Sequence, residues 1–218
     1  MKIAIMQPTY IPWAGYFALI SYVDKFIFLD NVQFNERSWQ QRNKIYSNGN
    51  IQWLTIPVNK KNYRNKKILD IEIDKKDNFY RKHLKTILQS YAKSKNLNIY
   101  KSLIERFYQK KFEKLSDMNI FIIKIVCENL GINTKFLNAS EIIADGNKSD
   151  LLLKICKKLN CDEYVSPPGS RTYLDDDQGM FKKNKIEIKY FVYEAVEYNT
   201  FYKPFIPNLS VVDLILNC

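Results

Sequence analysis

The order of the first thirty residues constrains the fold more than any other feature of the chain. Lys2–Met6 is apolar and stops at Gln7-Pro8, which predicts a strand that ends in a loop. In Ala14–Val23 the apolar residues recur at helical spacing after a proline, and Phe26–Leu29 is a second apolar run. A strand, a helix and a strand in close succession predict a βαβ unit, and therefore a parallel sheet with a right-handed crossover.

The rest of the chain continues to mix strands and helices. Lys44–Tyr46 and Ile51–Val58 flank the turn Ser47–Asn50 and are predicted to pair as a hairpin. Further strands are expected at Ile68–Ile73, Thr134–Leu137, Glu163–Ser166 and Ile186–Tyr193, the last being the longest. Helices are expected at Asp77–Lys93, Ile99–Leu115, Asn119–Leu130 with Gly131 as its C-cap, Lys148–Leu159 with Ser149 or Asp150 as its N-cap, and at the end of Phe205–Leu216. This pattern predicts an α/β fold: a mainly parallel sheet of nucleotide-binding type, flanked by helices, with a mostly helical middle section.

Length and composition fit one domain. The 218 residues, 46% of them hydrophobic, are enough to bury a core without disulfides or metals. Without repeats or a low-complexity linker, we expect residues 1–218 to form a single α/β domain, in which residues 77–130 are a possible helical sub-lobe. No apolar run has the length needed to cross a bilayer, and the N-terminus lacks the pattern of a signal peptide, so the expected compartment is the cytoplasm.

The net charge favours anionic partners. The chain carries 34 Lys+Arg against 23 Asp+Glu, a formal charge of +11. A positive field attracts nucleic acid or phosphorylated small molecules. The lysine pairs are spread along the chain and no nucleic-acid motif is present, which favours solvated surface lysines over a nucleic-acid module.

The cysteines and the single histidine do not form a metal-binding pattern. Cys127, Cys156, Cys161 and Cys218 are scattered without a C-x-x-C pair, and His83 is far from them in sequence. We expect buried, reduced thiols, no metal site and no cofactor.

Two segments near the N-terminus carry candidate binding residues. Gln7 and Pro8 follow the first strand, where ligands bind in open α/β sheets, and the next helix offers its N-terminus to an anion. Tyr10, Trp13 and Tyr16 add flat faces suited to a base or a sugar. The second segment holds arginines that suit phosphate and amides that suit sugar hydroxyls; its candidates are Gln33, Arg37, Trp39, Arg42 and Asn43. The alternatives are packing aromatics and a plain surface loop.

The remaining candidates lie further along the chain. His83 has the side chain whose ordinary pKa lies closest to neutrality, and it could act as a general base or form a structural hydrogen bond on a helix face. Asp30, after the second strand, could orient His83 or hold a substrate amine. Ser170 and Arg171 follow a predicted strand in a loop that suits phosphate but lacks the P-loop pattern, so a plain turn is equally compatible.

A family resemblance covers essentially the whole chain. The opening Met6–Phe17, the segment Leu29–Phe34 and the run Leu54–Val58 resemble the WbqC-like family, as do Lys82-His83 and Leu209–Leu214. The family is named for genes of O-antigen and other surface-polysaccharide clusters in bacteria, so the resemblance implies work on nucleotide-linked sugars in lipopolysaccharide biosynthesis. The family pattern has a second acid after Asp30. This chain has Asn31 there, which weakens a paired-carboxylate or metal role.

These observations lead to three functional hypotheses. The first is a transferase that modifies a nucleotide-linked amino sugar by acylating its amine, with an acyl donor as second substrate, His83 as base, and Arg37 and Arg42 on the phosphates. The second is a non-catalytic scaffold or regulator of polysaccharide assembly. The third is a basic nucleic-acid-binding protein, which is supported by charge alone.

Overall fold

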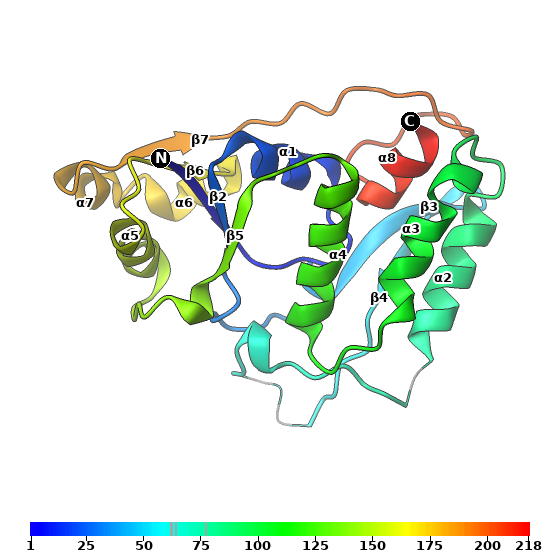
Figure 1. Cartoon of the computed structure of the whole chain (residues 1–218), viewed down its shortest axis with the longest axis horizontal. Coiled ribbons are helices and arrows are strands. Elements are labelled where there is room, and N and C mark those ends of the chain that lie inside the picture. The colour runs from blue at the N-terminus through cyan, green and yellow to red at the C-terminus, as the bar shows by residue number, and fades with distance from the viewer. Residues whose placement is uncertain (62, 64, 77) are drawn as a thin grey trace. The chain divides into compact units, whose positions relative to one another are not determined.

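The computed structural model describes residues 1–61, 63, 65–76 and 78–218 (Figure 1). Within them the chain forms two compact units. The sheet unit contains Met1–Gln7, Ala18–Asn31 and Ile132–Glu194, and the hairpin unit contains Pro8–Phe17, Val32–Gly131 and Ala195–Cys218. Both units are therefore assembled from three separate stretches of sequence, and the prediction of a single domain over residues 1–218 stays a prediction.

The sheet unit contains a five-stranded, all-parallel sheet, which confirms the predicted fold class. Its strands are β1 (Lys2–Met6), β2 (Lys25–Phe28), β5 (Lys135–Asn138), β6 (Glu163–Ser166) and β7 (Glu187–Tyr190), in the spatial order β5-β2-β1-β6-β7. The helix α1 (Ala14–Tyr22) connects β1 to β2, so the predicted βαβ unit is present. Flanking helices come from α5 (Lys148–Lys158), α6 (Arg171–Leu174) and α7 (Gln178–Lys183), with the short 3₁₀ turns η2 (Ala139–Glu141) and η3 (Pro168–Ser170).

The sequence of the two central strands explains their position. Ile3, Ala4, Phe26, Ile27 and Phe28 have no exposed surface, as expected of neighbouring strands that are covered on both faces. After its first lysine each strand is apolar instead of alternating with polar residues, which is typical of a parallel sheet.

The hairpin unit contains an antiparallel hairpin, the helical middle section and the C-terminal helix. Strands β3 (Arg42–Ser47) and β4 (Asn50–Thr55) pair around Asn48-Gly49, both with positive φ, which confirms the predicted hairpin. The helical middle section consists of α2 (Phe79–Ser90), α3 (Leu97–Gln109) and α4 (Leu115–Asn129), preceded by the 3₁₀ turn η1 (Ile68–Asp70) and followed, near the C-terminus, by α8 (Val211–Asn217). Leu130 is the C-cap of α4, and Gly131, the predicted cap, is the next residue, with a φ of +69° that suits the left-handed position after a helix end.

Three local predictions were wrong. Ile68–Ile73 is not a strand, because Ile68–Asp70 turns as a 3₁₀ helix and Glu72 and Ile73 form only isolated bridges. The last strand, β7, ends at Tyr190 and is shorter than β3 and β4. Asn147 occupies the N-cap of α5, so neither Ser149 nor Asp150 caps it. The predicted start of α2 at Asp77 lies outside the described residues.

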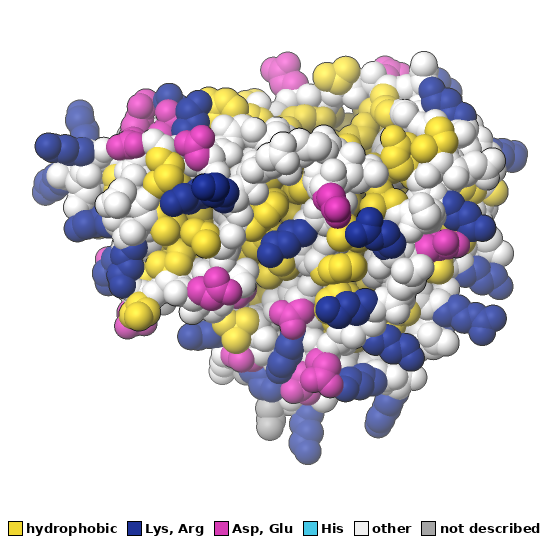
Figure 2. Space-filling view, in the orientation of Figure 1, with side chains coloured by type: hydrophobic (Ala, Val, Ile, Leu, Met, Phe, Trp, Pro, Cys, Tyr) yellow, Lys and Arg dark blue, Asp and Glu magenta, His cyan; other side chains and the backbone are white. Residues whose placement is uncertain are grey.

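The surface charges match the interpretation drawn from the sequence. Lysine and arginine side chains are scattered over the face shown in Figure 2 and alternate there with acidic and apolar groups. Among the helices of the described residues, none has the length and apolar character that a bilayer span requires.

Candidate functional site

The turn between β1 and α1 is held in place by buried amides. The side-chain amide of Asn43, in β3, donates to the carbonyl oxygens of Tyr10 and Ile11 at 3.0 and 2.9 Å. The amide of Asn119, in α4, donates to the carbonyl oxygens of Pro8 and Gln40 at 3.2 and 2.8 Å. These bonds satisfy carbonyl groups that would otherwise be buried without partners. They also hold Ile11 at a φ of +35°, which a β-branched residue rarely adopts.

Apart from Gln7, which belongs to the sheet unit, the two N-terminal segments with candidate binding residues therefore lie together within the hairpin unit. The backbone N–H of Tyr10 donates to the carbonyl oxygen of Trp39 at 2.9 Å, and Asn43 is the residue whose amide holds the turn. The sequence placed Asn43 among the residues that contact sugar hydroxyls. Its amide nitrogen donates to the chain itself and its oxygen accepts from the backbone N–H of Lys44, and its role in sugar binding stays a prediction.

The single histidine lies against this turn. The Nδ1 atom of His83, in α2, is 2.8 Å from the hydroxyl of Tyr10, which is 2.6 Å from the hydroxyl of Tyr108 in α3. Only 7% of His83 is exposed, and its ring meets those of Phe79 and Tyr108 edge to face. We call Tyr10, His83 and Tyr108 the histidine cluster.

Both tyrosines of the histidine cluster stay neutral at physiological pH. Burial raises the pKa of Tyr10 and of Tyr108 well above the ordinary value for tyrosine. Each hydroxyl therefore has one proton to donate, so the three groups form a chain of hydrogen bonds whose direction depends on the tautomer of His83. With a proton on Nδ1, the other ring nitrogen has a lone pair and the imidazole can act as a base.

The opposite face of the hairpin carries a different group of side chains. Along β3, Asn43 and Ile45 are buried, whereas Arg42 and Lys44 alternate with them and are partly exposed. The exposed rings of Trp39 and Trp53 lie 5.4 Å apart, next to both cations. We call Trp39, Arg42, Lys44 and Trp53 the tryptophan face. Because successive residues of a strand point to opposite sides, Arg42 and Asn43 do not face a common space.

The other predicted binding residues are distributed over both units. In the hairpin unit Pro8 and Tyr16 are buried, burial raises the pKa of Tyr16, and Trp13 lies so close to Gly15 that a Cβ there would clash with its ring. Gln33 and Arg37 are exposed in the same unit. In the sheet unit Gln7 is partly exposed, Ser170 bonds to Ser166 and Pro167, and Arg171 lies over the ring of Tyr190. Their binding roles stay predictions.

Asp30 belongs to the sheet unit and its carboxylate is engaged. One oxygen accepts the backbone N–H of Ser140 at 2.9 Å and the other accepts the Ser140 hydroxyl at 2.6 Å. The side chain is 4% exposed and these bonds anchor the turn η2, which is a structural use of the residue. A catalytic role for Asp30, and its proposed partnership with His83, stay predictions.

Replacing Asp30 by alanine is expected to lower the free energy of unfolding by about 1–3 kcal/mol, because two donors of Ser140 lose a buried acceptor. Urea denaturation measures the change. Ser140→Ala removes only the hydroxyl bond and should cost about 1 kcal/mol. An Asp30→Ala protein as stable as the wild type would contradict a structural role.

Sequence patterns did not single out several residues that build these sites. Asn119 and Tyr108 lie on helices whose apolar spacing made them look like ordinary core positions. Lys44 and Trp53 lie on the two strands of the predicted hairpin. If Ser47 is paired with Asn50 at the turn and the register is counted back from there, Lys44 falls opposite Trp53. Strand register was the usable clue, because it reports which side chains share a face.

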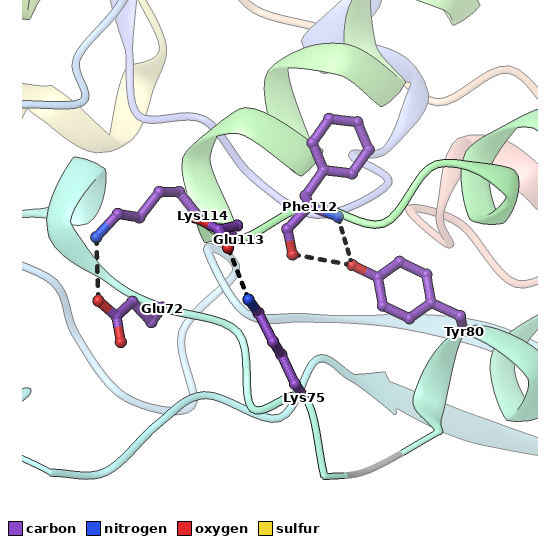
Figure 3. A network of polar contacts seen from close by, with 6 residues as sticks. All are labelled: Glu72, Lys75, Tyr80, Phe112, Glu113 and Lys114. Atoms are coloured by element: carbon purple, nitrogen blue, oxygen red, sulfur yellow. Dashed lines mark hydrogen bonds and ion pairs between the residues drawn. The ribbon is translucent and has the colours of Figure 1, made fainter.

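A second polar network lies near the start of α2 (Figure 3). Lys75 pairs with Glu113 at 2.6 Å and Lys114 with Glu72 at 3.4 Å, while the Tyr80 hydroxyl bonds to the backbone of Phe112. Cavities of about 370 and 460 Å³ adjoin it. Because its lysines are neutralised by neighbouring carboxylates, this network ties two loops together and offers little charge to an anion.

Fold and site together define an α/β protein with a parallel five-stranded sheet and a helical unit that supports a buried histidine. The chain belongs to the WbqC-like protein family, whose model matches residues 7–218. It is 33% identical over 219 residues to the uncharacterized protein Rv1507c of Mycobacterium tuberculosis (strain ATCC 25618 / H37Rv), an alignment that covers 99% of this chain and 93% of that protein. No solved structure matches the chain.

Proposed function

We propose that this protein is a transferase of bacterial surface-polysaccharide biosynthesis that acylates the amine of a nucleotide-linked amino sugar. Membership of the WbqC-like family supports the pathway. The observation that carries the proposal is the histidine cluster: the sole histidine of the chain is hydrogen-bonded to Tyr10, which belongs to the segment most typical of the family. We further propose that the protein acts in the cytoplasm and binds both substrates there.

The proposed reaction uses His83 as a general base. The sugar amine attacks the carbonyl carbon of an activated acyl donor, the new C–N bond forms, and the bond between the carbonyl carbon and the carrier breaks. His83 takes the proton that the amine loses and returns it to the departing carrier. Tyr10 positions the imidazole, and Arg37 and Arg42 contribute charge to the diphosphate.

A scaffold or regulator of polysaccharide assembly is the second candidate. The low exposure of His83 favours it, because a base must reach its substrate and a buried histidine among aromatic rings is commonly structural. The two functions differ in what they predict for ligands. A transferase binds a nucleotide sugar and turns it over, whereas a scaffold does neither.

Thermal denaturation with dTDP-, UDP- and GDP-linked amino sugars provides the first test. A ligand that binds the folded state at 100 times its Kd stabilises it by about 2.7 kcal/mol, which raises Tm by several degrees. The best ligand is then incubated with acyl donors, and the product is followed by mass spectrometry. Stabilisation with an added acyl mass supports the transferase, whereas no response to any sugar nucleotide would favour the scaffold.

A further inference from the structure

Two tryptophans of the hairpin unit are exposed side by side. Trp39 is 48% exposed and Trp53, in β4, is 40% exposed, with their ring centroids 5.4 Å apart. Aromatic rings of this size are rarely left on a surface together, because burying them is strongly favourable. An exposed aromatic pair therefore indicates a place where something else is bound.

Two cations adjoin these rings without a carboxylate partner. The guanidinium of Arg42 lies 4.2 Å from the Trp53 ring centroid, and the Lys44 ammonium lies 5.5 and 5.2 Å from those of Trp39 and Trp53. Of the carboxylates in the described part of the chain, none pairs with either cation, and the Nε of Arg42 is buried without a hydrogen-bond partner there. The lysines of the network in Figure 3 are, in contrast, all paired.

The backbone beneath the tryptophan face is held in place by hydrogen bonds. Lys44 is directly opposite Trp53 in the antiparallel pair, and Arg42 opposite Thr55, so the hairpin register fixes which side chains meet. The carbonyl oxygen of Trp39 accepts the N–H of Tyr10, and the buried Asn43 between the two cations anchors β3 to the same turn. A surface fixed in this way loses little conformational entropy when a ligand binds.

We propose that the tryptophan face binds a nucleoside diphosphate. The base stacks on the exposed indole of Trp39, and the diphosphate lies against Arg42 and Lys44, which supply the charge that the chain itself leaves unpaired. This assignment rests on the proposed function in one respect, namely that the substrate is nucleotide-linked. The backbone bond from Tyr10 to Trp39 links this face to the turn that carries the histidine cluster, while Arg42 and Lys44 point to the side of β3 opposite Asn43.

Single-stranded nucleic acid is the competing ligand for an aromatic and basic surface. Such binding generally uses several aromatic groups along a basic groove. Here one tryptophan pair and two cations form a compact group, and the lysine pairs of the chain are spread along the sequence instead of following one segment. The dimensions of the group therefore favour a single nucleotide.

Isothermal titration calorimetry of the full-length protein with UDP, dTDP, GDP and inorganic pyrophosphate tests the proposal. We expect at least one nucleoside diphosphate to bind more tightly than pyrophosphate. Trp39→Ala and the double variant Arg42→Gln/Lys44→Gln should each weaken that binding by about 10-fold or more, the effect expected from one stacked base or from lost charge-assisted bonds.

Two matched variants serve as controls. Tyr22→Ala removes another exposed aromatic ring that has a lysine over it, and Lys110→Gln removes another lysine that lies over two rings. Both should bind like the wild type, and circular dichroism verifies that all variants fold.

Three results would overturn the assignment: no binding of any nucleoside diphosphate, unchanged affinity in the Trp39 and Arg42/Lys44 variants, or tighter binding of an oligothymidine with a steep salt dependence.

The experiments also distinguish a failure of this inference from a failure of the proposed function. Nucleotide binding lost in these variants, without acyl transfer in the wild type, would support the tryptophan face and refute the transferase. Acyl transfer by the wild type, with an unchanged KM for the sugar nucleotide in these variants, would support the transferase and refute nucleotide binding at the tryptophan face.

Discussion

Replacing His83 by asparagine is expected to lower the kcat of acyl transfer by about 10²–10⁴-fold, the usual contribution of a general base. Asparagine keeps an amide near the position of Nδ1, so the hydrogen bond to Tyr10 can persist while the titratable imidazole is lost. Stability should therefore change little, whereas turnover of the acylated product, followed by mass spectrometry, should nearly disappear. Arg81→Gln, on the exposed side of the same helix, is the control and should keep full activity.

Tyr10→Phe examines the same cluster without touching the base. Loss of the hydroxyl removes one hydrogen bond from His83 and one from Tyr108, so the protonation of the imidazole is no longer coupled to this hydroxyl. We expect the pH dependence of kcat to shift while KM stays near its wild-type value.

The result that would contradict a catalytic role concerns the first variant. If His83→Asn retains wild-type turnover and loses only stability, the histidine is a structural residue and the scaffold becomes the better hypothesis.

Replacing Asp213 by alanine is expected to lower the free energy of unfolding by about 3–5 kcal/mol, the upper range for a single substitution. Asp213, in α8, has no exposed surface and accepts hydrogen bonds from the hydroxyls of Tyr91 and Tyr202 at 2.8 Å and Tyr198 at 2.6 Å. Alanine leaves a cavity and three hydroxyls without their acceptor. Urea denaturation followed by circular dichroism measures the loss.

Two further variants identify the cause. Tyr198→Phe removes one donor and should cost about 1 kcal/mol. Asp213→Asn keeps an acceptor of the same size and should cost less than alanine. A cost for alanine no greater than that for asparagine would mean that neither the retained acceptor nor the side-chain volume stabilises the fold, which would contradict the prediction.

Asp213 also gives the protein a pH dependence of known sign. Burial raises the pKa of its carboxyl in the folded state, although the three tyrosine hydroxyls oppose that shift. The folded state therefore holds the proton to higher pH than the unfolded chain does, so this contribution to stability is complete below the unfolded pKa and is lost as pH rises through the folded pKa. Asp213→Asn should abolish that part of the pH dependence.

The sequence predicted the sheet unit well because its evidence is local. Short runs such as Lys2–Met6 and Glu163–Ser166 have buried centres and are bounded by proline or polar residues, a local pattern that is typical of parallel strands. Ile68–Ile73 failed for the opposite reason. It alternates like a strand, but its partners are the distant residues Lys114 and Val58, and these allow only isolated bridges.

The sequence indicated which segments contribute to the candidate site, but it did not show which side chains contact one another. Position after the first strand pointed to the turn at Tyr10, and the family resemblance pointed to His83, but nothing in the sequence joins these residues. Asn43 shows the limit most clearly. An amide suits a sugar hydroxyl and a backbone carbonyl equally well, and only tertiary structure decides which of the two it meets.

Each of the two units is built from three separate stretches of the chain, and this limits how recombination can exchange the units between related genes. The helix α1 begins in the hairpin unit and ends in the sheet unit, and the final segment from Ala195 onward returns to the hairpin unit. No single cut in the gene yields either half intact: truncation after Glu194 spares the parallel strands but removes α8 and its aspartate. Recombination therefore cannot exchange one unit between relatives by a single fusion, because each unit is assembled from three stretches of sequence.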